Sequence, residues 1–262
     1  MINKFLNILN TFILELIGLL NLPVSNRPVA FCYHSISEDG WEFSRSKNDF
    51  ISDLATIQET KKFIDLNSFI NSSYADLYGK AILTFDDGYS DFSDVTFPIL
   101  KDKKIPVTLF VIGEPEKSDR SVLGTEKNLL NINQIKELKE KGVDIGFHTN
   151  THQVLNGLTE NELEKEISKN KLEETVSTQI KSFAYPKGIK FKNYSKKLKE
   201  ARYSIAFSVD NSLVHNNSGY NISRILISNK TSNKQLKAYL TEAWYLYSMF
   251  IKTLVNIKES IL

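Results

Sequence analysis

The chain has 262 residues, 41% of them hydrophobic, and its 33 basic and 31 acidic side chains give a formal net charge of +2. This length and apolar content suffice for one large domain with a full core. The mixing of both charges along the chain argues against a dedicated nucleic-acid surface, so no nucleic-acid partner is expected. The single cysteine, Cys32, excludes an internal disulfide framework and fits a reducing compartment.

Residues 1–27 are predicted to contain an amphipathic helix. Polar residues and a glycine interrupt the apolar sequence at helical spacing, which is not the pattern of a continuous membrane span. One lysine precedes the apolar residues and no small-residue cleavage site precedes Pro23, so the segment is a poor signal peptide. We expect the helix to pack on its own domain, with a membrane surface as the alternative.

Residues 28–230 alternate between short apolar runs and helical stretches. The predicted strands are Val29–Tyr33, Lys62–Leu66, Ala81–Phe85, Pro106–Ile112, Val143–Phe147, Lys181–Tyr185, Ser204–Val209 and Ile222–Ile227. The predicted helices include Asn48–Glu59, Asn133–Lys141, Glu160–Glu174 and Asn193–Ala201. This alternation predicts an α/β fold, a distorted or incomplete (β/α) barrel of about seven parallel strands. The chemistry of such a barrel lies at the C-terminal ends of its strands.

Residues 231–262 are predicted to form another helix, with aromatic residues at Tyr239, Trp244, Tyr245, Tyr247 and Phe250. We expect these rings to lie in a core or an oligomer contact, because a wide apolar face normally buries itself. A place at a bilayer interface is the alternative, since Trp and Tyr prefer that region. The chain is thus expected to be one barrel domain with helical extensions at both termini.

Two predicted strand tips carry side chains that can bind a metal ion. Asp86 and Asp87 in TFDDG follow the strand at 81–85, where they repel each other unless a positive group lies between them or one is protonated. A solvated turn is the structural alternative. His148 and His152 in HTNTH are four residues apart, on a helical turn or a tight loop, within reach of one ion. One aspartate with two histidines leaves positions open for water and substrate, while the other aspartate stays free as a base.

TFDDG followed by HTNTH resembles the first two signature motifs of the polysaccharide deacetylases, the NodB-homology class or carbohydrate esterase family 4. The resemblance covers about residues 29–227. It implies that Asp86 is the catalytic base and that Asp87, His148 and His152 bind one divalent metal ion. Two imidazoles and one carboxylate suit Zn²⁺ most readily, with Co²⁺, Ni²⁺ or Mn²⁺ as alternatives.

The third family motif, usually Arg-x-Pro-x-Gly, corresponds to FAYPKG, which keeps Pro186 and Gly188. Ala184 stands where the family has the arginine that orients the base. Arg224, in YNISRILI at the tip of a late strand, is the candidate substitute. The resemblance also implies that the backbone N–H of Tyr185 helps to stabilise the oxyanion.

The general acid of the family is a histidine, and no match to the usual C-terminal motif is found. His34 in AFCYHSIS resembles the N-terminal YH motif of the exopolysaccharide deacetylase branch, in which the acid histidine precedes the aspartates. We therefore expect His34, as imidazolium, to protonate the leaving amine. His215, in a polar loop, is the weaker candidate.

The implied function is removal of N-acetyl groups from amino sugars of a polysaccharide or its lipid-linked precursor. The alternatives are an O-acetyl esterase or small-molecule amidohydrolase on the same fold, and a catalytically inactive sugar-binding module. The aromatic residues near the motifs are expected either to stack on sugar rings or to pack in the core; they are Trp41, Phe43, Tyr89 and Tyr185. We expect a cytoplasmic enzyme, and the alternatives are peripheral membrane contact through its terminal helices and export.

Overall fold

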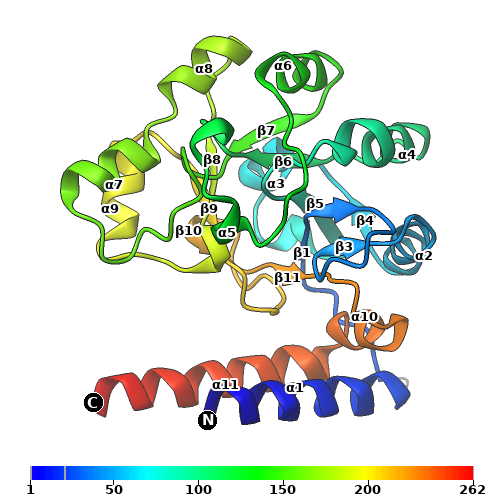
Figure 1. The fold of residues 1–262 in the computed structure, drawn as a ribbon. Helices are drawn as coiled ribbons and strands as arrows, with labels where there is room; N and C mark the ends of the chain where they lie inside the picture. Colours follow the sequence, from blue (N-terminus) through cyan, green and yellow to red (C-terminus); the bar gives the residue numbers. More distant parts are fainter. Residues whose placement is uncertain (1, 21, 262) are drawn as a thin grey trace.

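The computed structural model describes residues 2–20 and 22–261, and of these it describes residues 2–8, 252 and 254–261 by their backbone alone. A curved parallel sheet forms the centre of the molecule, with helices around it (Figure 1). Two long helices from the ends of the chain lie along one side of this barrel (Figure 1).

The sheet confirms the predicted fold class. In spatial order its strands are β10 (Gly219–Ile222), β9 (Ile205–Phe207), β8 (Ser182–Ala184), β7 (Asp144–Phe147), β6 (Thr108–Val111), β5 (Lys80–Phe85), β1 (Val29–Tyr33) and β11 (Ile225–Leu226). A further strand, β4 (Lys62–Phe63), pairs with β5 beside this path. Every one of these pairs is parallel.

One short segment joins the two edges of the sheet. Only Ser223 and Arg224 separate β10 from β11, yet β10 pairs with β9 while β11 pairs with β1. The N–H groups of Ser208 and Asp210 donate to Ile222 O and Arg224 O, which continues the pairing past the end of β10. β10 and β11 therefore share one position, so the eight strands on the path occupy seven positions of a distorted barrel.

The central strands are largely apolar because both of their faces are buried. β1, with the sequence VAFCY, has all its residues buried. Successive side chains point to opposite faces. Ala30, Ile82 and Phe110 belong to the cluster inside the barrel, whereas Phe31 and Leu83 belong to the larger cluster under the surrounding helices.

Short helices connect most of the strands. They are α2 (Lys47–Gln58), α3 (Leu66–Asn71), α4 (Phe97–Asp102), α5 (Arg120–Leu123), α6 (Ile132–Glu140), α7 (Glu160–Ile167), α8 (Asn170–Val176) and α9 (Tyr194–Glu200). After β1 the chain forms a separate parallel pair, β2 (Ser35–Ile36) with β3 (Ser44–Arg45).

Two predicted elements differ from what their periodicity suggested, one by ending early and one by being divided. The strand expected at Lys62–Leu66 stops at Phe63, because the Asp65 side chain accepts from Ser68 N and starts α3. The helix expected at Glu160–Glu174 is divided into α7 and α8. There the side-chain amide of Asn150 donates to Lys165 O and Ser168 O, which takes these carbonyls out of the helical ladder.

The C-terminal segment forms two helices, α10 (Asn233–Tyr239) and α11 (Glu242–Ile261), instead of the one predicted. Between them Leu240 O accepts from Ser25 N, and the Thr241 hydroxyl caps α11 by accepting from Trp244 N. The first helix, α1 (Ile2–Leu19), lies beside α11 and packs on α10 (Figure 1). Within the described ranges, none of the helices combines the length and apolar character needed to cross a membrane.

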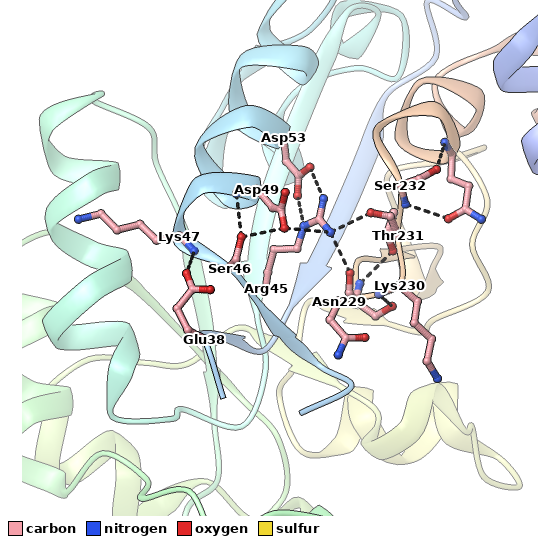
Figure 2. A network of polar contacts seen from close by, with 12 residues as sticks. Glu38, Arg45, Ser46, Lys47, Asp49, Asp53, Asn229, Lys230, Thr231 and Ser232 are labelled. Carbon is pink, nitrogen blue, oxygen red and sulfur yellow. Dashed lines mark hydrogen bonds and ion pairs between the residues drawn. The ribbon is translucent and has the colours of Figure 1, made fainter. Parts of the chain in front are cut away.

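A buried arginine links the barrel to the start of α10. Arg45 of β3 forms two hydrogen bonds of 2.8 Å with the Asp53 carboxylate of α2. Its Nη1 donates to Thr231 O at 2.8 Å, just before α10 (Figure 2). The Tyr33 hydroxyl of β1 also donates to Asp53. This network holds α2, β1 and the beginning of the terminal helices in one arrangement.

Candidate active site

The predicted catalytic and metal-binding side chains lie at the C-terminal ends of three parallel strands of the sheet: His34 after β1, Asp86 and Asp87 after β5, and His148 and His152 after β7. The ends of parallel strands meet at one rim of a barrel, so residues distant in sequence converge there. Arg224 arrives at the same rim from the segment that closes the barrel.

Three side chains converge on one point. Nε2 of His148 lies 3.3 Å from Oδ1 of Asp87, and Nε2 of His152 lies 3.2 Å from the same oxygen. Asp87 Oδ1 is buried and forms no hydrogen bond within the described part of the chain. Ligands held about 2.0–2.2 Å from one tetrahedral ion are separated by about 3.3–3.6 Å. The donor set therefore fits a single divalent cation.

His148 is oriented for metal binding by its other ring nitrogen. Nδ1 lies 2.8 Å from Ala184 O. A carbonyl oxygen only accepts, so Nδ1 carries a proton, and Nε2 is the ring nitrogen that faces Asp87 and could bind a cation. Ala184, the residue that stands in place of the family arginine, thus contributes to the site through its backbone.

The two loops that carry the site adopt strained backbone conformations. Asp87 has φ 70°, and His152 has φ 62° on a tight loop in which its N–H donates to the Thr149 hydroxyl. Non-glycine residues rarely adopt positive φ, and such strain is concentrated at functional sites. The turn at Asp87 lets two consecutive carboxylates face different partners.

Asp86 faces Arg224. Nη1 and Nη2 of Arg224 bind the two oxygens of Asp86 at 2.6 and 2.7 Å, and both side chains are buried. Arg224 is held in turn by Ser208 O and by the Thr84 hydroxyl. Cys32 also donates its thiol to Asp86 Oδ2, at 3.3 Å. Because both Asp86 oxygens are occupied in this way, Asp87 is the better metal ligand of the two.

The electrostatics separate the roles of these groups. Burial alone would raise the pKa of Asp86, but the Arg224 guanidinium and His148 hold it below its ordinary value. Burial likewise opposes ionisation of Asp87, yet His152 and His148 keep its pKa low. Burial lowers the pKa of His152 to about 4, which leaves its imidazole neutral, as a metal ligand must be. Both aspartates are therefore carboxylates at neutral pH.

The three candidate metal ligands and Asp86 open into a cavity of about 320 Å³, which we call the catalytic pocket. His34 lines it, with its ring stacked on Phe43 at 5.0 Å. His34 Nδ1 is buried and forms no hydrogen bond with any described residue. Burial lowers the pKa of His34, although Asp87 and Asp86 oppose this shift. The free site therefore holds His34 as neutral imidazole, not as the predicted imidazolium.

The predicted role of the Tyr185 N–H is wrong, whereas the rings of Tyr185 and Tyr89 follow the packing alternative and His215 stays the weaker candidate. The Tyr185 N–H cannot serve an oxyanion, because it continues the sheet by donating to Phe207 O. Tyr185 and Tyr89 are fully buried, so neither can stack on a sugar. His215 follows Val214, whose N–H donates to Pro28 O before the start of β1, and this places His215 near the opposite end of the barrel.

Other lining residues were not expected from the sequence. Val122, Leu123, Lys187 and Leu226 line the catalytic pocket, and no local motif indicates them. Cys32 was also missed, although its spacing was a usable signal. It stands two residues before His34 at the end of β1, and residues i and i+2 of a strand share a face.

Residues 78–206 match the family model described as polysaccharide deacetylase. This match covers just under half of the chain, includes Asp86, Asp87, His148 and His152, and identifies the central segment as a polysaccharide deacetylase domain. It is 28% identical to the poly-beta-1,6-N-acetyl-D-glucosamine N-deacetylase of Staphylococcus aureus (strain MSSA476), over 79% of this chain and 76% of that protein. It is also 28% identical to YxkH of Bacillus subtilis (strain 168), over 61% of this chain, and it spans only 55% of that relative.

Solved structures share the fold. IcaB from Ammonifex degensii superposes with a TM-score of 0.69 at 20% identity, covering 83% of this chain and 98% of that one. The deacetylase PplD of Streptococcus pyogenes, in complex with acetate, gives a TM-score of 0.65 at 21% identity, covering 83% and 99%. At these identities the likeness supports the barrel architecture alone.

Proposed function

We propose that this chain is a metal-dependent hydrolase that removes N-acetyl groups from amino sugars of a glycan. The observation that carries the proposal is the donor set of Asp87, His148 and His152, which opens into one pocket beside an Asp86 held by Arg224. The similarity to a poly-N-acetylglucosamine N-deacetylase supports an amino-sugar substrate.

The three donors would hold one divalent cation, and Zn²⁺ is the first candidate for two imidazoles and a carboxylate. A cation bound there supplies a Lewis acid for the acetyl carbonyl and a water of lowered pKa. His148 is kept in the ligating tautomer by Ala184 O, and the low pKa of His152 keeps that ring deprotonated.

Asp86 is proposed as the general base. A carboxylate has about four lone-pair sites, so the bonds from Arg224 and Cys32 leave it able to accept a proton from water. Arg224 fixes the orientation of Asp86 and keeps it ionised. We therefore assign to Arg224 the positioning of the base, which in the family is done by an arginine at the position of Ala184.

His34 is proposed to protonate the leaving amine. Its ring lines the pocket beside Phe43. Because burial lowers its pKa, His34 does not carry this proton beforehand, and the proton that it would deliver is the one that the attacking water releases to Asp86. Membership of the branch with an N-terminal YH motif is part of the same proposal.

The test combines metal content with acetate release from N-acetylglucosamine oligomers. We expect Asp86→Asn to keep its metal and to release acetate about 10²–10⁴-fold more slowly, because a positioned base contributes that much. We expect His148→Ala to lose the metal and the activity together. Equal metal loss in the two variants would contradict the division of roles, and metal-loaded wild type that releases no acetate would contradict the function.

A further inference from the structure

A second cavity, of about 500 Å³, lies between the rim of the barrel and the terminal helices. We call it the helix-side cleft. Its walls come from α1, α10 and α11 on one side and from the loops after β2 and β9 on the other. Its volume lies within the range of about 300–1,000 Å³ that ligand pockets usually occupy.

The helix-side cleft adjoins the catalytic pocket. Phe43 and Leu226 line both cavities. These two side chains therefore form the boundary between the cavities, and a ligand that spans both would have to pass over them toward α11. The residues that line the cleft all fall outside positions 78–206, so this wall is not part of the domain that the family model describes.

The lining combines aromatic rings with uncharged polar groups. The Tyr247 hydroxyl donates to Asn10 Oδ1 at 2.8 Å, and this pair joins α11 to α1. Trp244 Nε1 donates to Asn211 O at 2.6 Å. Aromatic rings pack against the C–H faces of sugars, while amide and hydroxyl groups exchange hydrogen bonds with sugar hydroxyls.

The charges of the lining separate the candidate ligands. Asp210 and Glu42 contribute carboxylates, and none of the described lining residues is a lysine or arginine. Glu42 already pairs with Lys230 at 2.7 Å. A phosphate or pyrophosphate group, as in a nucleotide- or lipid-linked sugar, would therefore meet carboxylates and no lysine or arginine among the described lining residues. An acyl chain would displace water from the carboxylate and amide groups of the lining, which costs free energy.

We propose that the helix-side cleft binds further sugar units of a neutral glycan chain whose acetylated unit occupies the catalytic pocket. The proposal rests on the proposed function and deepens it, because it makes the substrate a polymer without phosphate near the reacting sugar.

The test is the dependence of acetate release on oligomer length. For wild type we expect kcat/KM to rise from the N-acetylglucosamine monomer to longer oligomers. Tyr247→Ala should lower kcat/KM for the longer oligomers about threefold to tenfold and leave the monomer unchanged. Tyr247→Phe, which keeps the ring, should retain most of the length dependence. The control is Leu246→Ala on the same helix, because this neighbour is 61% exposed.

A second readout does not depend on turnover. Titration calorimetry on metal-loaded Asp86→Asn should show tighter binding of longer oligomers, and adding Tyr247→Ala should remove that gain. Acetate release whose dependence on length is the same in wild type and Tyr247→Ala would overturn the cleft proposal while leaving the proposed function intact. Wild type that releases no acetate but binds longer oligomers through Tyr247 would overturn the function and support the cleft.

Discussion

Asp86 and Asp87 are adjacent in sequence but have different partners. The positive φ of Asp87 turns its carboxylate toward the two histidines, whereas Asp86 faces the guanidinium of Arg224. The two neighbouring carboxylates are expected to repel each other. Asp86 is compensated by the guanidinium of Arg224, and Asp87 faces the two histidines with which it could hold a cation. One dipeptide can in this way supply both a base and a ligand.

The Arg224–Asp86 pair makes a prediction at the residue scale. Arg224→Gln would leave a buried carboxylate without its counter-charge, and we expect unfolding free energy to fall by about 3–5 kcal/mol. The pKa of Asp86 should rise, so the acidic limb of the kcat/KM profile should move to higher pH. Urea unfolding and a pH–rate profile of metal-loaded protein would measure both effects.

Arg45 provides the matched control, since it is also buried and also paired with an aspartate, Asp53, but does not line the catalytic pocket. Arg45→Gln should lower the free energy of unfolding to a similar degree and leave the acidic limb of the kcat/KM profile at the same pH. An unchanged limb in Arg224→Gln, or a shifted limb in both variants, would refute the positioning task of Arg224.

At the scale of elements, α1 approaches α10 so closely that a side chain is not accommodated at Gly18. A Cβ atom there would lie 2.4 Å from Lys234 O, a backbone atom that cannot move aside cheaply. Leu14 and Ile17 of the same helix are buried, as expected for a helix that packs on its own domain. Glu15 also accepts from the Ser232 hydroxyl that caps α10.

This contact predicts that Gly18→Leu separates the two helices. We expect unfolding free energy to fall by about 1–3 kcal/mol, because overpacking of a close contact costs that much and exceeds the gain in helix propensity. Leu19→Ala, at a position that is 62% exposed, should change it by less than about 0.5 kcal/mol. Chemical denaturation would decide, and equal stability of the two variants would contradict a packed α1.

At the scale of the whole molecule, the terminal helices give the barrel a second layer with two different faces. The inner face forms a wall of the helix-side cleft through Tyr247 and Trp244. The outer face leaves Phe12 64% and Phe250 59% exposed, together with Leu246. The same two helices can therefore both extend the substrate site and present an apolar surface.

Contact of this outer face with a membrane stays a prediction. If it occurs, the intact protein should sediment with anionic vesicles at low salt, and Phe12→Ser with Phe250→Ser should release it, because apolar side chains anchor an interfacial helix. Tyr247→Ala, on the inner face, is the control and should still sediment. Wild type that remains wholly in the supernatant would contradict the prediction of membrane contact.

The sequence by itself determined the repeating βα units and the motif residues at the strand ends, because apolar periodicity and short motifs are local properties. His34, Asp86, Asp87, His148 and His152 were all identified in this way. The break between α7 and α8 and the break between α10 and α11 were not identified. They depend on hydrogen bonds from distant segments, donated by Asn150 and by Ser25.

Only the tertiary structure decided which groups complete the site. Arg224 reaches Asp86 across 138 positions because one segment pairs with both edges of the sheet and closes the barrel. The pairing of β8 with β9 engages the Tyr185 N–H and removes it from the chemistry. The helix-side cleft exists because α1 and α11 pack side by side over the rim. Each depends on contacts between residues far apart in sequence, which local patterns do not encode.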